Sequence, residues 1–159
     1  MSPEENDNGN DPTNSGKPES DAKVTALPRL LKVQLDAGKR LALITANGQP
    51  TPGDFETCTL ELLDHPEWKP WMNLLVDYRE LINFDFSVDG IRRISQLFKD
   101  RAAELGDGKC AVVVPNLLIY GLFNMWYPWL PDELQWDVKA FRQFEEACLW
   151  LGIAPDNVQ

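Results

Sequence analysis

The residues from Cys110 to Pro131, CAVVVPNLLIYGLFNMWYPWLP, form a run of 22 without a charged side chain, in a chain whose formal net charge is −10. A membrane-spanning helix needs roughly 20 apolar residues, so length alone would allow a span. The run instead starts with a β-branched segment, 111–114, that favours a strand, and Pro115 interrupts it. The segment after this break, Leu117 to Tyr127, would form a helix about 16 Å long, which is too short to cross. The run therefore predicts a buried strand and then an apolar helix, and no membrane span.

Strand-like and helix-like patterns alternate along the rest of the chain. Residues 31–36 alternate apolar and polar side chains, and after a short turn residues 40–48 form a second strand that ends in the Asn47-Gly48 turn signal, which predicts an antiparallel hairpin. Helices are predicted for 51–65, for 87–105 as one continuous amphipathic helix, and for about 142–151. The strands between them are predicted at 72–78, 110–114 and 134–141. The order ββαβαβαβα predicts an α/β fold with a mixed sheet, whose later strands are parallel.

The first 22 residues have a different composition from the rest. They carry six acidic side chains and one lysine, with no aromatic residue, so we expect residues 1–22 to be a disordered acidic tail. The segment lacks the basic start and apolar core of a secretory signal. A single domain is predicted for residues 23–159. That domain is acidic as well, which disfavours nucleic acid and anionic lipid surfaces as partners.

The residues that most often carry catalysis or bind metals are sparse. Cys58, Cys110 and Cys148 are far apart, and each lies within an apolar pattern, which is typical of buried, reduced thiols in a cytoplasmic protein. His65 is the only histidine and has neither a nucleophile nor enough metal ligands beside it in the sequence. No phosphate-binding loop is present. We therefore expect no enzyme activity, no metal and no cofactor.

Three segments resemble a known family. They are HPEWKPWMNLLVDYRELINFDFSVDGIRRI, IYGLFNMW and VKAFRQFEEACLWLGI. Together they resemble the SpoIIAA-like family of small bacterial STAS-fold proteins over about residues 30 to 153. The resemblance implies a mixed β-sheet with helices packed mainly on one face, no cofactor, and usually no enzymatic activity.

The superfamily offers two functional precedents. Anti-sigma-factor antagonists bind a partner kinase and are switched by phosphorylation of a serine. Lipid-transfer domains of the CRAL-TRIO type hold hydrophobic ligands in a pocket. The fold alone does not choose between these two functions. The resemblance therefore implies a binding or regulatory domain without indicating what it binds.

The phosphoacceptor of the antagonists lies in a D-S-S-G-type turn at the start of a helix, and the stretch FDFSVDG matches this motif in part. Asp85 matches the acid and Ser87 the second serine, whereas Phe86 replaces the first. This departure weakens the phosphorylation hypothesis, and Ser87 is also predicted to be an ordinary helix N-cap. Asp77 follows a buried strand, where α/β folds collect functional residues. We favour the structural interpretation, a turn-forming acid or a local partner of Arg79.

The apolar helix at 117–127 is the strongest candidate site, because it lacks the polar face that a helix covering a sheet normally shows. Three interpretations remain open: a wide core, a contact with a second subunit or regulatory protein, and a pocket for a hydrophobic small molecule or lipid. The residues predicted to form the ligand or dimer site are Tyr120, Phe123, Trp126, Tyr127 and Trp129. The alternative function is a phosphorylation-switched interaction module that uses Ser87.

Overall fold

The computed structural model describes residues 29–84 and 87–158. Within those residues, five strands form one sheet in the order β1-β2-β3-β4-β5. The strands are β1 (Leu31–Asp36), β2 (Leu41–Gly48), β3 (Asn73–Leu81), β4 (Lys109–Val113) and β5 (Asp137–Phe141). The first two are antiparallel and the other neighbours are parallel, so the predicted hairpin and mixed sheet are confirmed. The predicted tail, 1–22, and the predicted start of the domain at residue 23 lie outside the described residues.

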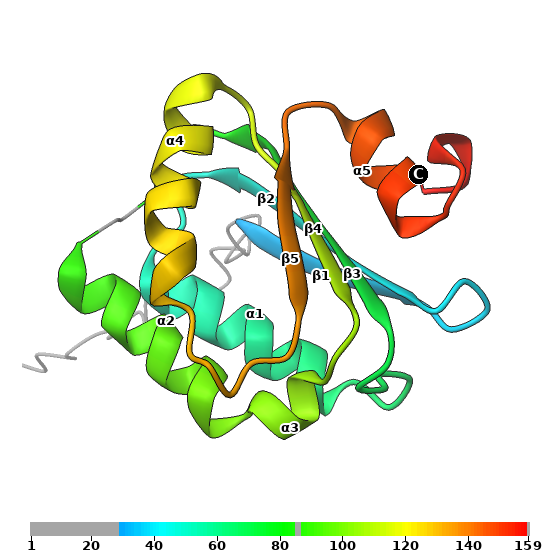
Figure 1. Ribbon diagram of the computed structural model, residues 1–159, viewed down its shortest axis with the longest axis horizontal. Helices are drawn as coiled ribbons and strands as arrows, with labels where there is room; N and C mark the ends of the chain where they lie inside the picture. The colour runs from blue at the N-terminus through cyan, green and yellow to red at the C-terminus, as the bar shows by residue number, and fades with distance from the viewer. Residues whose placement is uncertain (1–28, 85–86, 159) are drawn as a thin grey trace, which may run out of the picture.

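The helices lie on both faces of the sheet, but most of them share one face (Figure 1). The longer helices on that face are α1 (Pro52–Asp64), α2 (Val88–Asp100) and α4 (Leu117–Trp126), and the one on the opposite face is α5 (Phe144–Leu151). Short elements complete the order: α3 (Ala102–Leu105) and the 3-10 turns η1 (Tyr127–Trp129) and η2 (Pro155–Asn157). The predicted α/β architecture is therefore confirmed. No helix in the described ranges is long and apolar enough to cross a membrane.

The alternation of side chains along the central strands creates two separate cores. On β4 and just after it, Cys110, Val112 and Val114 face α1 and α4, whereas Ala111 and Val113 face α5. β3 behaves in the same way, because Leu74 and Val76 belong to the first core and Leu75 to the second. Both strands are thus covered on both faces, which explains their continuous apolar sequences.

The helix predicted as continuous from 87 to 105 is wrong in one respect, because it breaks at Arg101. That residue ends α2 with φ −114° and ψ 18° and is followed by the single turn α3. Leu105, at the end of α3, is fully buried. Gly106 then adopts φ +84° so close to Pro70 that a Cβ atom would lie 1.7 Å from the Pro70 carbonyl oxygen. This long-range packing outweighs the local helical pattern.

Candidate ligand site

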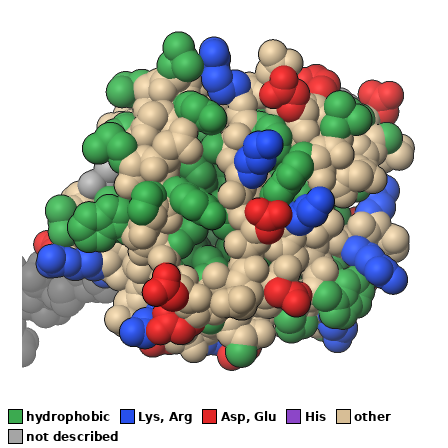
Figure 2. Space-filling view, viewed as in Figure 1, with side chains coloured by type: hydrophobic (Ala, Val, Ile, Leu, Met, Phe, Trp, Pro, Cys, Tyr) green, Lys and Arg blue, Asp and Glu red, His purple; other side chains and the backbone are tan. Residues whose placement is uncertain are grey.

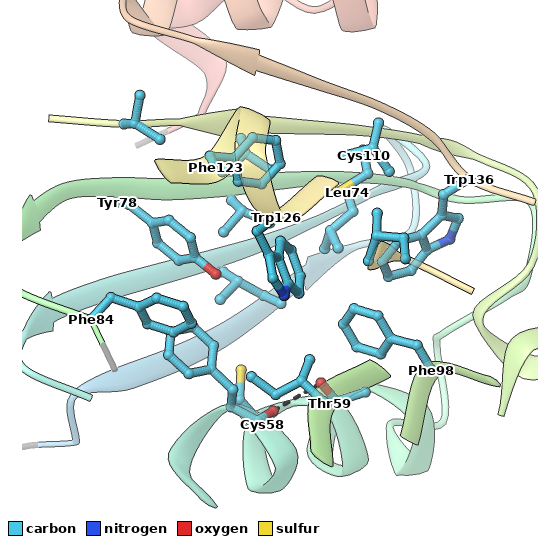
Figure 3. Close-up of a pocket in the computed structure, with 18 of the residues that line it drawn as sticks. Cys58, Thr59, Leu74, Tyr78, Phe84, Phe98, Cys110, Phe123, Trp126 and Trp136 are labelled. Atoms are coloured by element: carbon cyan, nitrogen blue, oxygen red, sulfur yellow. Dashed lines mark hydrogen bonds between the residues drawn. The ribbon is translucent and has the colours of Figure 1, made fainter. Parts of the chain in front are cut away.

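An apolar cavity of about 100 Å³ lies between the sheet and the helices α1, α2 and α4. Its walls come from β2, β3, β4 and β5, together with the inner faces of the three helices. Figure 3 shows side chains from these elements pointing into one space. The lining side chains are hydrophobic apart from one threonine, one tyrosine hydroxyl and two thiols. Among the described residues, no charged side chain lines this cavity.

Helix α4 forms one wall of the cavity because of how it begins. Asn116 is its N-cap, and the Asn116 Oδ1 accepts a 2.9 Å hydrogen bond from the backbone N–H of Ile119. From that start, Ile119, Phe123 and Trp126 recur at helical spacing and all three line the cavity. The first two are buried, and the third is partly buried.

Aromatic side chains from other elements close both ends of the cavity. At one end, Phe55 on α1 makes edge-to-face contacts with Tyr78 and Phe84, with ring centroids 5.9 and 4.7 Å away. At the other end, Phe98 on α2 contacts the ring of Trp136 at 5.8 Å. Edge-to-face pairs of this kind each contribute about 0.5–1.5 kcal/mol beyond burial, which helps to hold these walls in place.

Most polar atoms at the cavity wall are satisfied within the protein. The Thr59 hydroxyl donates to the Phe55 carbonyl oxygen at 2.8 Å, and the Trp136 Nε1 donates to the Leu105 carbonyl oxygen at 2.9 Å. Trp126 is different: its Nε1 is buried and has no hydrogen-bond partner among the described residues. The Tyr78 hydroxyl also lies at the wall of this cavity.

The ionisable groups of the cavity stay neutral at physiological pH. Burial raises the pKa of the Cys58 thiol and of the Cys110 thiol from the ordinary value near 9 to about 12. Burial also raises the pKa of Tyr78 well above its usual value. A thiol with so high a pKa is a poor nucleophile, because only the thiolate reacts. The cavity wall therefore carries hydrogen-bond donors but no charged group.

The structure brings together two of the five predicted site residues. Phe123 and Trp126 line the cavity, whereas Tyr120 is partly buried against the same core without lining it. Tyr127 and Trp129 lie on the surface, with 42% and 62% of their area exposed. The helix is therefore the expected wall, but the turn after it is not.

The outer face of α4 is more exposed than the sequence predicted. Leu118 and Met125 expose 70% and 72% of their area, and Leu117 exposes 64%. Neither Trp68 nor Trp71 covers these side chains. Trp68 is buried and bonded to the Glu104 carbonyl oxygen, and Trp71 is exposed beside Arg40. The helix thus has one apolar face on the cavity and one on the surface.

The remaining candidates have local structural roles. Ser87 is exposed and caps α2, with the Gly90 N–H donating to its hydroxyl at 3.1 Å. The motif residues 85 and 86 lie outside the described residues. Asp77 accepts two hydrogen bonds from the Arg79 guanidinium, at 2.8 and 2.9 Å, as in the local-partner interpretation. His65 ends α1, and its Nδ1 accepts a hydrogen bond from the Glu67 N–H.

Several lining residues were missed at the sequence level, above all Tyr78, Cys58 and Trp136. A usable signal existed for two of them. Tyr78 is two residues beyond Val76 on the same strand, so both side chains lie on the same face of the sheet. Trp136 is two residues before Val138, which lines the cavity, so the same argument applies to it.

Within the described ranges, no group of three or more His, Cys, Asp or Glu side chains is arranged to hold a metal ion.

A solved structure with a similar fold comes from Shewanella loihica PV-4 and is described as an uncharacterized protein from the DUF3478 family with a SpoIIAA-like fold. The two chains are 19% identical, the TM-score is 0.52, and the match covers 76% of this chain and 91% of the other. This likeness confirms the SpoIIAA-like fold that the three sequence segments implied, and at this identity it shows the fold alone. No known family profile matches the chain. No curated protein sequence matches it significantly either.

Proposed function

We propose that this protein is a non-catalytic binding domain that holds a small hydrophobic molecule in the cavity beneath α4. The observation that supports this function is the cavity itself, which is walled by hydrophobic side chains from four strands and three helices. Protein cores are normally close-packed and contain few voids larger than a water molecule. A cavity of this size in a small domain therefore favours a binding role over ordinary close packing.

The volume of the cavity limits the size of the ligand. An apolar cavity of about 150 Å³ in another protein holds a benzene molecule, and the cavity here is about 100 Å³. Because this space is smaller, a single ring would fill it, and any substituent on the ring needs room outside the cavity. Figure 2 shows hydrophobic side chains at the bottom of a hollow in the region that Figure 1 places between α4 and β5. A ligand chain can extend through this hollow.

The chemistry of the walls supports binding rather than catalysis. General acid–base catalysis needs a group whose pKa lies near the working pH. The pKa values of Cys58, Cys110 and Tyr78 are all raised away from neutrality by burial. These groups fit a site that holds a ligand and leaves it unchanged.

Methyl-resolved NMR with toluene as the probe tests this function, because the isoleucines include both cavity residues and controls. Ile44, Ile94 and Ile119 line the cavity. Ile82 is exposed and Ile153 packs in the α5 core, so both serve as internal controls. We expect toluene to shift the first set selectively and saturably. Equal shifts at all positions, or none, would refute the proposal. Native mass spectrometry of protein purified from its own host then gives the mass of the natural ligand.

The phosphorylation switch is a second candidate, favoured by the exposed position of Ser87 at the start of α2. A phosphate at a helix N-terminus is stabilised by the helix dipole and the free N–H groups. Phosphoproteomic analysis of the host under several growth conditions tests it. We expect a modified Ser87 if the switch operates, and the consistent absence of phosphate rejects it.

A further inference from the structure

We propose that the cavity ligand is an uncharged molecule carrying a hydrogen-bond acceptor, such as a carbonyl or ether oxygen, that receives the N–H of Trp126. This inference rests on the proposed function and makes it more specific, because filling an apolar cavity requires no polar atom at all. The acceptor gives the ligand a fixed orientation, with its polar atom at Trp126 and its apolar part against the sheet.

The state of the Trp126 indole carries the argument. Its Nε1 is buried without a hydrogen-bond partner among the described residues. Two other indoles that reach the interior of this face, Trp68 and Trp136, both donate to backbone carbonyl oxygens at 2.9 Å. Buried polar groups in folded proteins are nearly always paired, and an unpaired donor is costly. An indole N–H can only donate, so the missing partner must be an acceptor.

The geometry directs this donor into the cavity. Trp126 is the last residue of α4, and its ring packs against Phe123 with 6.0 Å between centroids. Figure 3 shows the indole nitrogen pointing into the cavity, with the Tyr78 hydroxyl directed towards the same region. The Tyr78 hydroxyl can either donate or accept. A single ligand oxygen in this region can therefore receive hydrogen bonds from both residues.

The walls exclude a charged ligand. No charged side chain from the described part of the chain lines the cavity, so a carboxylate would lose its hydration without gaining a counter-ion. The same surroundings hold the two lining thiols in their neutral form. A neutral oxygen atom can accept the hydrogen bond from the Trp126 Nε1 without the free-energy cost of burying a charge.

Two probes of nearly the same shape test the inference on the full-length chain. Acetophenone carries a carbonyl oxygen where α-methylstyrene carries a methylene group, so they differ in the acceptor alone. Affinities are measured for both by NMR titration of the wild type and of Trp126→Phe, which keeps an aromatic ring and removes the donor. The matched control is Trp129→Phe, because Trp129 is exposed and does not line the cavity.

We expect Trp126→Phe to reduce the preference for acetophenone over α-methylstyrene by about fivefold, as for the loss of one hydrogen bond. Trp129→Phe should leave this ratio unchanged. In the wild type, acetophenone should move the Trp126 indole N–H resonance downfield and α-methylstyrene should not. This last measurement decides the question even if the Trp126 variant does not fold. Benzoate, the charged analogue, should bind far more weakly than acetophenone.

The outcomes separate the two proposals. If both probes bind in the cavity but the ratio and the indole resonance do not distinguish them, the acceptor is refuted and the apolar binding function stands. If benzoate binds as tightly as acetophenone, the restriction to uncharged ligands is refuted. If neither neutral probe binds, the proposed function fails and this inference fails with it.

Discussion

Trp136 donates a 2.9 Å hydrogen bond from its Nε1 to the carbonyl oxygen of Leu105. The bond joins the end of α3 to the segment that leads into β5, and it holds the indole ring edge-on against Phe98 at the cavity wall. The bond thus fixes one end of the candidate site. Trp126 lines the same cavity but differs from Trp136, because its buried Nε1 has no hydrogen-bond partner among the described residues.

Replacing Trp136 by phenylalanine should lower the free energy of unfolding by about 1–3 kcal/mol, because the buried Leu105 carbonyl oxygen loses its donor. Urea denaturation measures this change. The control is Trp129→Phe at an exposed position, where we expect a change within about 0.5 kcal/mol. Similar losses for the two variants would contradict the structural role of the Trp136 bond.

Ser87→Ala should cost about 1 kcal/mol, because the Gly90 N–H loses the cap that it donates to. Ser87→Asp retains an acceptor at the N-cap and should restore most of this stability. Thermal unfolding of the two variants side by side provides the measurement. If the alanine and aspartate variants are equally destabilised, the capping role assigned to Ser87 is wrong.

Two glycines with positive φ should respond very differently to alanine. Gly106 has φ +84° and no room for a Cβ atom beside Pro70, so Gly106→Ala should cost several kcal/mol or prevent folding. Gly152 ends α5 with φ +74° in open space, so Gly152→Ala should cost only about 1–2 kcal/mol from the backbone conformation. Both variants carry the cost of a positive φ, and only Gly106→Ala also carries the steric contact with Pro70. The difference between their urea denaturation midpoints therefore measures that contact.

Alkaline pH should destabilise the domain through its buried thiols. Burial raises the pKa of Cys58 and Cys110 to about 12, whereas in the unfolded chain both ionise near 9. Between these values the folded state binds more protons, so the stability that is fully present below pH 9 is lost as the pH rises towards 12. Each thiol therefore makes the free energy of unfolding fall as the pH rises through this range.

Urea unfolding at about pH 8, 9.5 and 10.5 measures this dependence. The double variant Cys58→Ala with Cys110→Ala serves as the comparison, because it retains every lysine and tyrosine that also titrates in this range. We expect a clearly shallower decline in the double variant. Parallel declines would mean that the two thiols are not buried as the structure shows.

The sequence predicted the arrangement of strands well, because the strand signals are local. The alternation in β1 and the apolar runs of β2, β3 and β4 record which faces are covered. The break at Arg101 was missed because its causes lie far away in the chain. Gly106 packs against Pro70, and the last carbonyl groups of the helix are bonded by two distant indoles.

The candidate site was predicted only in part, for a related reason. The absence of a polar face on α4 correctly indicated that Phe123 and Trp126 meet an apolar environment. It could not show that Leu118 and Met125 remain on the surface, because exposure depends on what the other elements leave uncovered. A cavity is a property of several elements together. Its far wall, with Phe55 and Tyr78, is not encoded near α4.

Two adjacent valines on β4 provide the sharpest test of the cavity. Val112 lines it, whereas Val113 is fully buried in the packed core beneath α5. Val112→Phe adds a ring where there is space, so we expect the stability to change by no more than about 1 kcal/mol. Val113→Phe overfills a close-packed region and should cost about 1–3 kcal/mol or more.

Because the added ring occupies the ligand volume, Val112→Phe should also abolish the toluene-induced shifts of the cavity isoleucines while the domain stays folded. Equal destabilisation by the two variants, measured by urea denaturation, would show that both sides of the sheet are packed alike and that α4 covers an ordinary core.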